Sequence, residues 1–231
     1  MIVITQPTYL PWTGYFDLID RSKTFIFLDD VQFNTRSWQQ KNRIVFNEKY
    51  KDLTVPVKKK GLRYQKIKET EVFDHKFIDQ HLSIIYDSYH KSKFFNVYFP
   101  SLKKVYEKFN NTNLIAEINI SLIRKICSLI KIDSKFVLSS SLNVNFKGSE
   151  KLANICSILN KKNYLTNVGS LDYLQKEEEK KYFLSKKIKV FIQNYKCMEY
   201  QQQSSEFLDK ASVLDLLFNK GDKALDSIKN G

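Results

Sequence analysis

Short apolar runs that stop abruptly at polar loops dominate the start of the chain. Ile2–Ile4 ends at a loop rich in Pro, Tyr and Trp, an amphipathic stretch follows, and Phe25–Leu28 ends at Asp29-Asp30. A strand, a loop, a short helix and a second strand in this order predict the beginning of a parallel α/β sheet. Parallel strands end at the same edge, so we expect Gln6 and the aspartate pair to lie side by side there, where open α/β sheets bind ligands.

The same alternation returns late in the chain, after a long helical stretch. Apolar positions recur at helical spacing through residues 74–132, which we interpret as a helical insertion. We predict an α/β fold in a single domain over 1–231, with a mostly parallel, Rossmann-like sheet, a nucleotidyltransferase-like start and flanking helices. We expect strands over 2–5, 24–28, 44–46, 53–57, 135–138, 163–166 and 188–192, and helices over 14–21, 148–159, 171–182 and 212–218, with Ser149 as an N-cap.

Composition indicates a soluble protein that attracts anions. No apolar run approaches the ~20 residues that span a bilayer, and no signal-like start is visible, so we expect a cytoplasmic protein. The net charge is +13, but 33 lysines stand against 5 arginines and are spread along the chain. Dedicated nucleic-acid binders rely more on Arg, so a phosphorylated small molecule fits this charge better.

Most motifs of common enzyme and metal sites are missing. The three cysteines are far apart, with no CxxC and no zinc-finger spacing, so we expect reduced, mostly buried thiols and assign no metal ligands. HExxH, P-loop and GxGxxG patterns do not occur. The first loop reads Pro11-Trp12-Thr13-Gly14-Tyr15 where nucleotidyltransferases with this start carry His-x-x-His, so we do not expect adenylyl transfer by that route.

Polar residues that directly follow predicted strands are the first candidates for a site. If all these strands are parallel, one rim collects Gln6, Asp29, Asp30, Lys58, Ser139, Ser140, Asn167 and Ser170. The segment 167–170 also precedes a helix, whose N-terminus suits phosphate or carboxylate; the alternative is an ordinary cap, with Asp172 and Tyr173 as capping and packing residues.

Asp30 and His81 are the candidates for proton transfer. Adjacent residues of an extended chain point to opposite sides, so we expect one aspartate, Asp30, to face the site. The pair can serve as a metal ligand, a general base or a grip for an ammonium or sugar hydroxyl, or it can simply cap the loop. His81 lies on an apolar helix stripe, which fits a core histidine as well as a base.

The loop over 29–43 combines residues that suit a nucleotide sugar. Arg36 and Arg43 can make forked contacts to phosphate, and Trp38 can stack on a sugar or base; anchoring of the loop to the core is the alternative. Trp12 is equally suited to binding or to packing on the sheet. We expect Gln6, Asp30, Arg43 and Lys58 to line one hollow that accepts an anion.

Several motifs together resemble the WbqC-like family of bacterial surface-polysaccharide gene clusters, over nearly the full length. The matching residues are Gln6-Pro7-x-Tyr9-x-Pro11-x-x-Gly14-Tyr15-Phe16, Asp29-Asp30-Val31-Gln32-Phe33, Arg36-x-Trp38, Asn42-Arg43-Ile44, Thr54-Val55-Pro56-Val57-Lys58, His81-Leu82 with Tyr89, Gly169-x-x-Asp172-Tyr173 and Ser212-x-Leu214-Asp215-Leu216-Leu217-Phe218-Asn219-x-Gly221. The usual Gly-Pro-x-Gly is replaced by Asn167-Val168-Gly169-Ser170.

The resemblance implies a transferase of O-antigen (lipopolysaccharide) synthesis, since one family member has been proposed to transfer glycine. It would attach an amino acid, as an amide, to the amine of a dTDP- or UDP-linked amino sugar. Asp30 or His81 would be the base, and donors to the oxyanion would come from Gln6, Gln32 or Asn42. Arg36, Arg43 and Lys58 would hold phosphates; Tyr9, Trp12, Asp29, Trp38, Ser139 and Ser170 complete the candidate substrate site.

The acyl donor and two other functions stay open. The donor can be an aminoacyl-adenylate formed from ATP, an aminoacyl-tRNA or a thioester, and a tRNA donor would also use the positive charge. One alternative function is an ATP-dependent amino-acid ligase or nucleotide-binding enzyme of the same fold. The other is a non-catalytic basic module that binds RNA or a partner protein.

Overall fold

The chain forms two compact units, each assembled from separate segments. The computed structural model describes the backbone of residues 1–231 and every side chain except those of Asp172 and Tyr173. The sheet unit comprises Met1–Gln6, Asp17–Asp30 and Asp133–Tyr195. The hairpin unit comprises Pro7–Phe16, Val31–Ile132 and Lys196–Gly231. Helix α1 (Thr13–Asp20) contributes residues to both.

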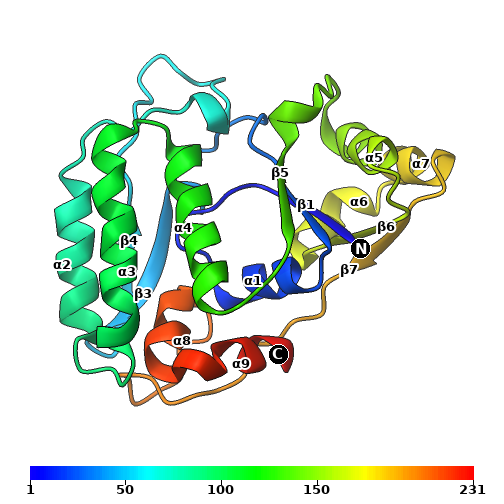
Figure 1. Ribbon diagram of the computed structural model, residues 1–231. Helices are drawn as coiled ribbons and strands as arrows, with labels where there is room; N and C mark the ends of the chain where they lie inside the picture. The colour runs from blue at the N-terminus through cyan, green and yellow to red at the C-terminus, as the bar shows by residue number, and fades with distance from the viewer. The chain divides into compact units, whose positions relative to one another are not determined.

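A five-stranded parallel sheet organises the sheet unit, as the sequence predicts. Its strand order is β5-β2-β1-β6-β7, and every pairing between neighbours is parallel. Strand β1 lies at the centre, between β2 and β6, and Figure 1 shows it next to β6. The strands are β1 (Ile2–Thr5), β2 (Thr24–Phe27), β5 (Lys135–Leu138), β6 (Asn163–Thr166) and β7 (Lys189–Ile192).

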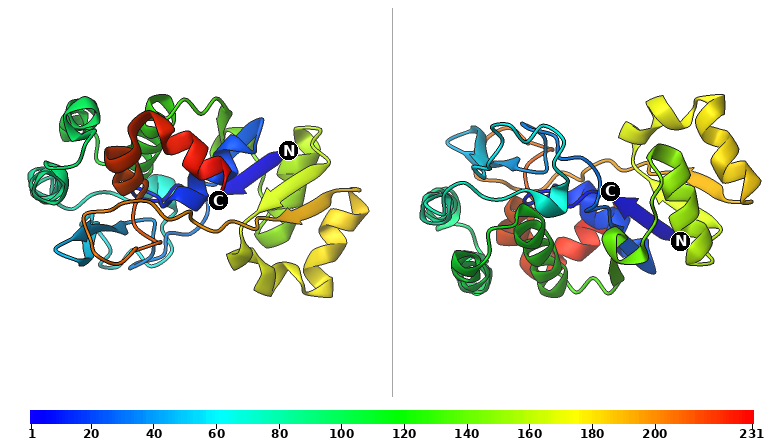
Figure 2. Two further views of the ribbon diagram at one scale, coloured as in Figure 1. Left: turned by 90° about the horizontal axis from the view of Figure 1, so that it is seen from below. Right: turned by 90° about the horizontal axis from the view of Figure 1, so that it is seen from above.

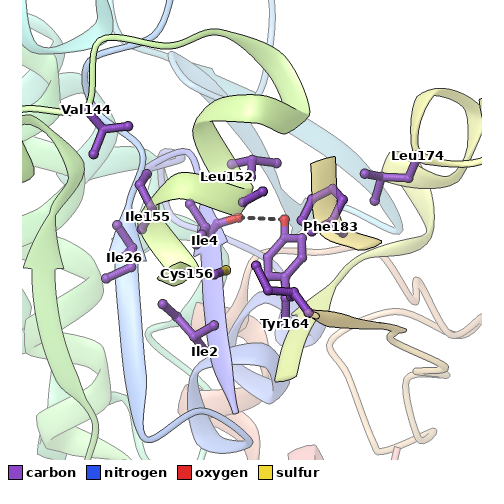
Figure 3. Close-up of a cluster of buried hydrophobic side chains, with 12 residues drawn as sticks. Ile2, Ile4, Ile26, Val144, Leu152, Ile155, Cys156, Tyr164, Leu174 and Phe183 are labelled. Carbon is purple, nitrogen blue, oxygen red and sulfur yellow. Dashed lines mark hydrogen bonds between the residues drawn. The ribbon is translucent and has the colours of Figure 1, made fainter. Parts of the chain in front are cut away.

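The core of the sheet unit lies between the central strands and helix α5 (Gly148–Ile158). The apolar side chains of β1 and β2 are almost wholly buried, as expected for strands covered on both faces. Figure 3 shows Ile4 of β1 and Leu152 of α5 close to Tyr164 of β6. The Tyr164 ring stacks on Phe183 with centroids 5.7 Å apart.

Two local predictions about the helices of this unit are wrong. The expected helix over 171–182 is interrupted, giving α6 (Leu171–Leu174) and α7 (Glu177–Ser185). A new helix begins at Glu177 because the three glutamates in its first turn complement the positive end of the helix dipole. Ser149 does not cap α5: Lys147 holds the N-cap position, and the Ser149 hydroxyl lies buried inside the first turn with no hydrogen-bond partner among the described residues.

An antiparallel hairpin gives the hairpin unit its name. It pairs β3 (Lys41–Phe46) with β4 (Lys49–Thr54). Strand β3 begins earlier than the expected 44–46 and is therefore longer, and β4 lies closer to the turn than the expected 53–57. The turn is tighter than expected because Asn47 and Glu48 both adopt left-handed backbone angles, with φ of 47° and 65°. Two consecutive residues of this kind form the turn that matches the twist of a hairpin.

Helices form much of the remaining hairpin unit, and three of them lie within 74–132, where the periodicity predicts helices. Figure 2 shows α2 and α3 side by side, viewed nearly along their axes. Tyr89 and Phe95 both pack on Phe218, with ring centroids 5.2 Å apart in each pair. The helices are α2 (Phe77–Tyr89), α3 (Phe95–Lys108), α4 (Ile115–Leu129), α8 (Val213–Lys220) and α9 (Ala224–Lys229).

Short 3-10 turns join several of these elements, at Ile67–Glu69, Phe109–Asn111, Ser139–Leu142, Val168–Ser170 and Gly221–Lys223. In the described part of the chain, every helix is too short or too polar to traverse a bilayer. The two units are groups of residues with many contacts inside each group, which is a different criterion from a domain. The expectation of a single domain with a helical insertion therefore stays a prediction.

The core of the sheet unit predicts a clear contrast between two isoleucines of α5. Ile155 is fully buried, whereas Ile158 is 56% exposed. We expect Ile155→Ala to lower the free energy of unfolding by about 2–5 kcal/mol, the usual cost of emptying a packed site. Ile158→Ala should change it by less than about 0.5 kcal/mol. Thermal melting of both variants checks this, and equal losses would contradict the assigned packing.

Candidate active site

The carboxyl ends of β1, β2 and β5 bring four predicted candidates to one edge of the sheet. Gln6 follows β1, Asp29 and Asp30 follow β2, and Ser139 follows β5. Strand β2 pairs with both β1 and β5 in parallel register, so the predicted rim exists for these residues. Lys58 does not follow a strand of this sheet. The strand before it, β4, pairs with β3 in an antiparallel hairpin, and both Lys58 and that hairpin belong to the hairpin unit.

Asp29 fastens the end of β2 to the end of β5. Its carboxylate accepts hydrogen bonds from the Ser139 hydroxyl (3.0 Å), the Ser140 backbone N–H (3.0 Å) and the Ser140 hydroxyl (2.6 Å). It thereby satisfies a backbone donor at the start of the 3-10 turn Ser139–Leu142. The side chain is almost fully buried, so its geometry indicates a positioning role for Asp29.

Asp30 forms a largely enclosed ion pair with Lys151 of α5. Its Oδ2 accepts from the Lys151 ammonium at 2.7 Å, and its Oδ1 lies 2.5 Å from the Ser139 hydroxyl oxygen. Lys151 also donates to the Val144 carbonyl at 2.8 Å. The Lys151 side chain is 6% exposed and that of Asp30 is 13% exposed, so the carboxylate is the more accessible partner.

Both aspartates approach the same Ser139 hydroxyl, which corrects the expectation that they point to opposite sides. The alternation applies only to an extended chain, and the chain turns immediately after β2: the Asp29 backbone N–H donates to the Phe27 carbonyl at 3.0 Å. The turn places Asp29 and Asp30 around one hydroxyl instead of across the chain from each other.

The surroundings of Asp30 keep it ionised at neutral pH. Partial burial works to raise the pKa of its carboxyl, but the hydrogen bonds from Lys151 and Ser139 and the charge of Lys151 outweigh burial and lower the pKa. The carboxylate is therefore better suited to hold an ammonium or hydroxyl than to remove a proton from a strongly basic group.

Sequence reasoning missed Lys151. The sequence does carry one indication of its burial. Lys151 stands four residues before the apolar Ile155, so both lie on the same face of α5, which is the covered one. A lysine can bury its aliphatic stem and hold its ammonium at an edge, so a lysine on an apolar stripe is worth testing as a buried partner of a carboxylate.

The remaining candidates of the sheet unit follow β6. The Ser170 hydroxyl lies 2.9 Å from the Thr166 hydroxyl and 3.4 Å from Asn167 Oδ1. The helix that follows, α6, has four residues and therefore little dipole to offer an anion. The expected capping and packing roles of Asp172 and Tyr173 fall on side chains outside the described residues.

In the hairpin unit, His81 belongs to a buried chain of hydrogen bonds. Tyr9 contacts His81 Nδ1 through its hydroxyl at 2.8 Å and also contacts the Tyr106 hydroxyl. The imidazole makes a further bond to the Thr54 backbone that favours its protonated form, as a carbonyl acceptor does. A neutral ring with its proton on Nε2, and with Tyr9 donating to Nδ1, accommodates both contacts. Burial lowers the pKa of His81 to about 4.

Three other candidates of the hairpin unit make structural contacts. The amide of Asn42 donates to the carbonyls of Tyr9 and Leu10, which uses both its N–H groups. The backbone of Trp12 forms an isolated antiparallel β-bridge with Ser212. The Trp12 ring packs so closely on Gly14 that a Cβ at position 14 would clash with it. Gln32 donates to the Arg63 carbonyl at 3.1 Å. These contacts anchor the opening loop and its neighbours.

Aromatic and basic side chains gather along β3 and β4. The Arg43 guanidinium lies over the Tyr50 ring at 4.0 Å and over the Trp38 ring at 5.6 Å, and it donates to the Lys210 carbonyl. Trp38 stays 48% exposed, which leaves much of its ring open to solvent. Arg36 is exposed and adopts a left-handed backbone angle. Lys58 pairs with Glu71 at 2.5 Å.

The candidates thus divide between the two units. Gln6, Asp29, Asp30, Ser139 and Ser170 belong to the sheet unit, and Tyr9, Trp12, Gln32, Arg36, Trp38, Asn42, Arg43, Lys58 and His81 belong to the hairpin unit. That Gln6, Asp30, Arg43 and Lys58 line one hollow stays a prediction. Among the described side chains, no three His, Cys, Asp or Glu residues lie close enough to hold a metal ion.

Comparison with known proteins gives two matches of nearly full length. A model of the WbqC-like protein family matches residues 6–227. The uncharacterized protein Rv1507c of Mycobacterium tuberculosis is 31% identical over 229 residues, which cover 99% of this chain and 97% of that protein. No solved structure matches the chain. Because the family match spans both units, neither unit is an addition to the family's common architecture.

The ion pair of Asp30 predicts a pH-dependent loss of stability. A carboxyl with a lowered pKa stabilises the fold above its unfolded-state pKa, and this contribution disappears as the pH falls through the folded-state value. Asp30→Asn leaves Lys151 without its counter-charge, so we expect it to lower the free energy of unfolding by about 3 kcal/mol at pH 7. The difference in the free energy of unfolding between Asp30→Asn and the wild type should become smaller below about pH 4.

Thermal melting at pH 7 and at successively lower pH measures that deficit, with Asp133→Asn as the matched control. Asp133 is exposed and belongs to the same unit, so its replacement should have little effect at any pH. A deficit for Asp30→Asn that stays constant through acidification would show that the carboxylate is not ionised in the native state.

The pKa of His81 predicts a neutral imidazole throughout the physiological range. Nitrogen-15 NMR of the imidazole should show the Nε2–H tautomer and no titration between pH 8 and pH 5.5, because burial opposes the charged form. Titration of His81 close to 6.5 would contradict the burial and the hydrogen bond from Tyr9. His81→Ala identifies its signals among those of the three histidines.

Proposed function

The chain belongs to the WbqC-like protein family, and we propose that it is a transferase of surface-polysaccharide (O-antigen) biosynthesis. It attaches an amino acid or a related acyl group, glycine in the first instance, to the amine of a nucleotide-linked amino sugar. The family resemblance supports the reaction class, and the arrangement at the carboxyl edge of the sheet supports the choice of an amine as the acceptor.

The observation that carries the proposal is the ionised carboxylate of Asp30 at that edge. Its charge is fixed by Lys151 and its position by Ser139, while 13% of the side chain stays exposed. A preoriented carboxylate at the carboxyl end of parallel strands is placed where such sheets bind ligands. It complements an ammonium group, the state of an amino sugar before reaction.

The chemistry needs a neutral amine and a place for its proton. The amine nitrogen attacks the acyl carbon, a C–N bond forms, and the bond from the acyl carbon to the donor's leaving group breaks. The ammonium first loses one proton to water. After the attack, the positively charged nitrogen becomes strongly acidic as the leaving group departs, because an N-protonated amide is a very strong acid. A carboxylate with a low pKa can accept a proton from such a nitrogen, so we assign Asp30 as the group that orients the amine and receives its proton.

Asp30 is better placed for this role than His81. His81 is 4% exposed, and its Nδ1 already shares a hydrogen bond with the Tyr9 hydroxyl. Gln6 directly follows β1, beside the end of β2, and is the candidate donor to the developing oxyanion in the same unit as Asp30. Asn42 is less suited because both its N–H groups are used by backbone carbonyls.

Charge supports an anionic substrate. The net charge of +13 favours the approach of a nucleotide-linked sugar, which carries the negative charge of its diphosphate. Arg36 and Lys59 are exposed cations of the hairpin unit, and Trp38 offers an open ring beside Arg43. This combination suits a ligand that has both phosphate and ring components.

Transfer onto a purified amino-sugar nucleotide tests the proposal. We incubate the wild-type protein with a dTDP- or UDP-linked amino sugar and one of three donors: glycine with ATP, glycyl-tRNA or a glycyl thioester. Mass spectrometry should show a gain of one glycyl group with one of them. Asp30→Asn should slow transfer by about a hundredfold, and Asp133→Asn should leave it unchanged.

Ligand-induced stabilisation gives a second readout, independent of the donor. The amino-sugar nucleotide should raise Tm by mass action, and more so than an analogue in which a hydroxyl replaces the amine. Asp30→Asn should remove the difference between the two ligands. No glycyl product with any donor, together with equal stabilisation by both ligands, would overturn the proposal.

A further inference from the structure

A pocket of the hairpin unit lies where three distant segments of the chain meet. These are the turn between α2 and α3, the segment 201–203, and the end of α8 with the 3-10 turn that follows it. The pocket has a volume of about 610 Å³, which is within the range of small-molecule sites. All its lining residues belong to the hairpin unit, and none of them is a candidate residue of the active site.

Hydrogen bonds fasten the three segments to one another, so the fold itself sets the shape of the pocket. The backbone N–H of Phe94 donates to a carbonyl of α8 at 2.9 Å. Gln203 Nε2 donates to the Ser92 hydroxyl at 3.1 Å and to Asn219 Oδ1 at 3.4 Å. Gly221 has a φ of 56°, and a Cβ at this position would clash with the Phe94 ring. The pocket is therefore formed before any ligand arrives.

Lysines are concentrated in this pocket. They make up 33 of the 231 residues of the chain but four of the ten residues that line it, namely Lys91, Lys93, Lys220 and Lys223. Three of the four side chains are exposed, and Lys220 is half-buried. Among the described side chains, none of these four lysines has a carboxylate within salt-bridge distance.

The negative groups around the pocket do not balance these lysines. Asp222 supplies the carboxylate of the lining, and its Oδ1 accepts from the Tyr98 hydroxyl at 2.7 Å. Lys91 follows the end of α2 and Lys220 ends α8, so each also meets the negative end of a helix dipole, which is equivalent to about half a charge. Four positive charges thus face about two negative ones, and the pocket keeps an excess of about two positive charges.

This excess selects the chemistry of a ligand. Ammonium groups held around one pocket repel one another, and an anion between them removes that repulsion. A phosphate ester or a diphosphate matches the excess because it carries about two or more negative charges and has several oxygens that lysines contact as point charges. The exposed amide of Gln201 also lines the pocket and can donate to or accept from a hydroxyl of such a ligand.

We propose that this pocket binds a phosphorylated small molecule, with the phosphate oxygens on the ammonium groups of Lys91, Lys93, Lys220 and Lys223. The site is additional to the candidate active site, because its lining does not include Asp30 or any other candidate residue. It also does not depend on the proposed glycyl transfer, since the charge and the shape of the pocket alone define it.

Inorganic pyrophosphate is the probe that locates the site, because it presents the phosphate charge without any other group. NMR of the full chain in 0.15 M salt should show changes in the backbone N–H signals of the three segments that form the pocket when pyrophosphate is added. The expected signals are those of residues 91–94, 201–203 and 219–223. Changes confined to other parts of the chain would overturn the assignment.

Two double variants of equal charge test the lysines by isothermal titration calorimetry. Lys91→Gln with Lys223→Gln should weaken pyrophosphate binding by about tenfold, because two charge-assisted contacts are lost. Lys103→Gln with Lys104→Gln removes the same charge from exposed positions of α3, two turns further along the helix, and should weaken it less than about twofold. Both variants replace exposed lysines, so the fold should stay intact.

The comparison of these variants decides between a built site and a general attraction. A selective loss with Lys91→Gln and Lys223→Gln supports the pocket. Equal losses in the two double variants would mean that pyrophosphate responds only to the overall charge, and would overturn it. An RNA oligonucleotide that binds through the same lysines, while pyrophosphate does not bind, would also overturn the small-molecule site and indicate a nucleic-acid surface instead.

Discussion

The carboxylate of Asp29 is the contact on which the candidate active site depends. Parallel pairing places the ends of β2 and β5 next to each other, but pairing alone leaves the chain free to leave the sheet in several directions. Asp29 removes that freedom by accepting three hydrogen bonds from the two serines that follow β5. Asp30 is the next residue, so this anchor also holds the backbone of Asp30 near Ser139 and Lys151, which its carboxylate contacts.

Acidic and basic groups are distributed unequally between the interior and the surface. The protein has many more lysines than carboxylates, yet its most buried ionisable side chains include Asp29 and Asp215. Asp215 accepts from the Tyr200 hydroxyl at 2.7 Å and the Gln202 amide at 2.8 Å, and burial still raises its pKa. Asp29 and Asp215 thus organise the interior through neutral donors. Lys151 is buried against Asp30, and most of the other lysines stay at the surface, where they attract anions.

The sequence predicts the sheet well because its strands are short apolar runs with abrupt polar ends. The expected bounds of β1, β5 and β6 match those of the structure. A parallel sheet then follows from the order of elements, and it brings the residues after β1, β2 and β5 to one edge.

What sequence reasoning missed are properties of long-range packing. Lys151 lies far from Asp30 in the chain, and a lysine in a helix is usually exposed, so nothing local revealed the ion pair. Gln39 and Gln40 are chemically identical neighbours, but only the former has a backbone N–H in reach of its amide oxygen. That site residues from both units line one hollow stays a prediction for the same reason, because local sequence patterns place residues only within each unit.

The division of each unit into distant segments affects how the protein is made. β1 pairs with β6, and the backbone N–H of Val213 donates to Pro11, so early segments of the chain wait for late ones in both units. On the ribosome, neither core can close until most of the chain has emerged, and β1 and β2 meanwhile expose apolar edges that invite aggregation. The protein should therefore depend on chaperones during synthesis more than a chain whose cores close one after the other.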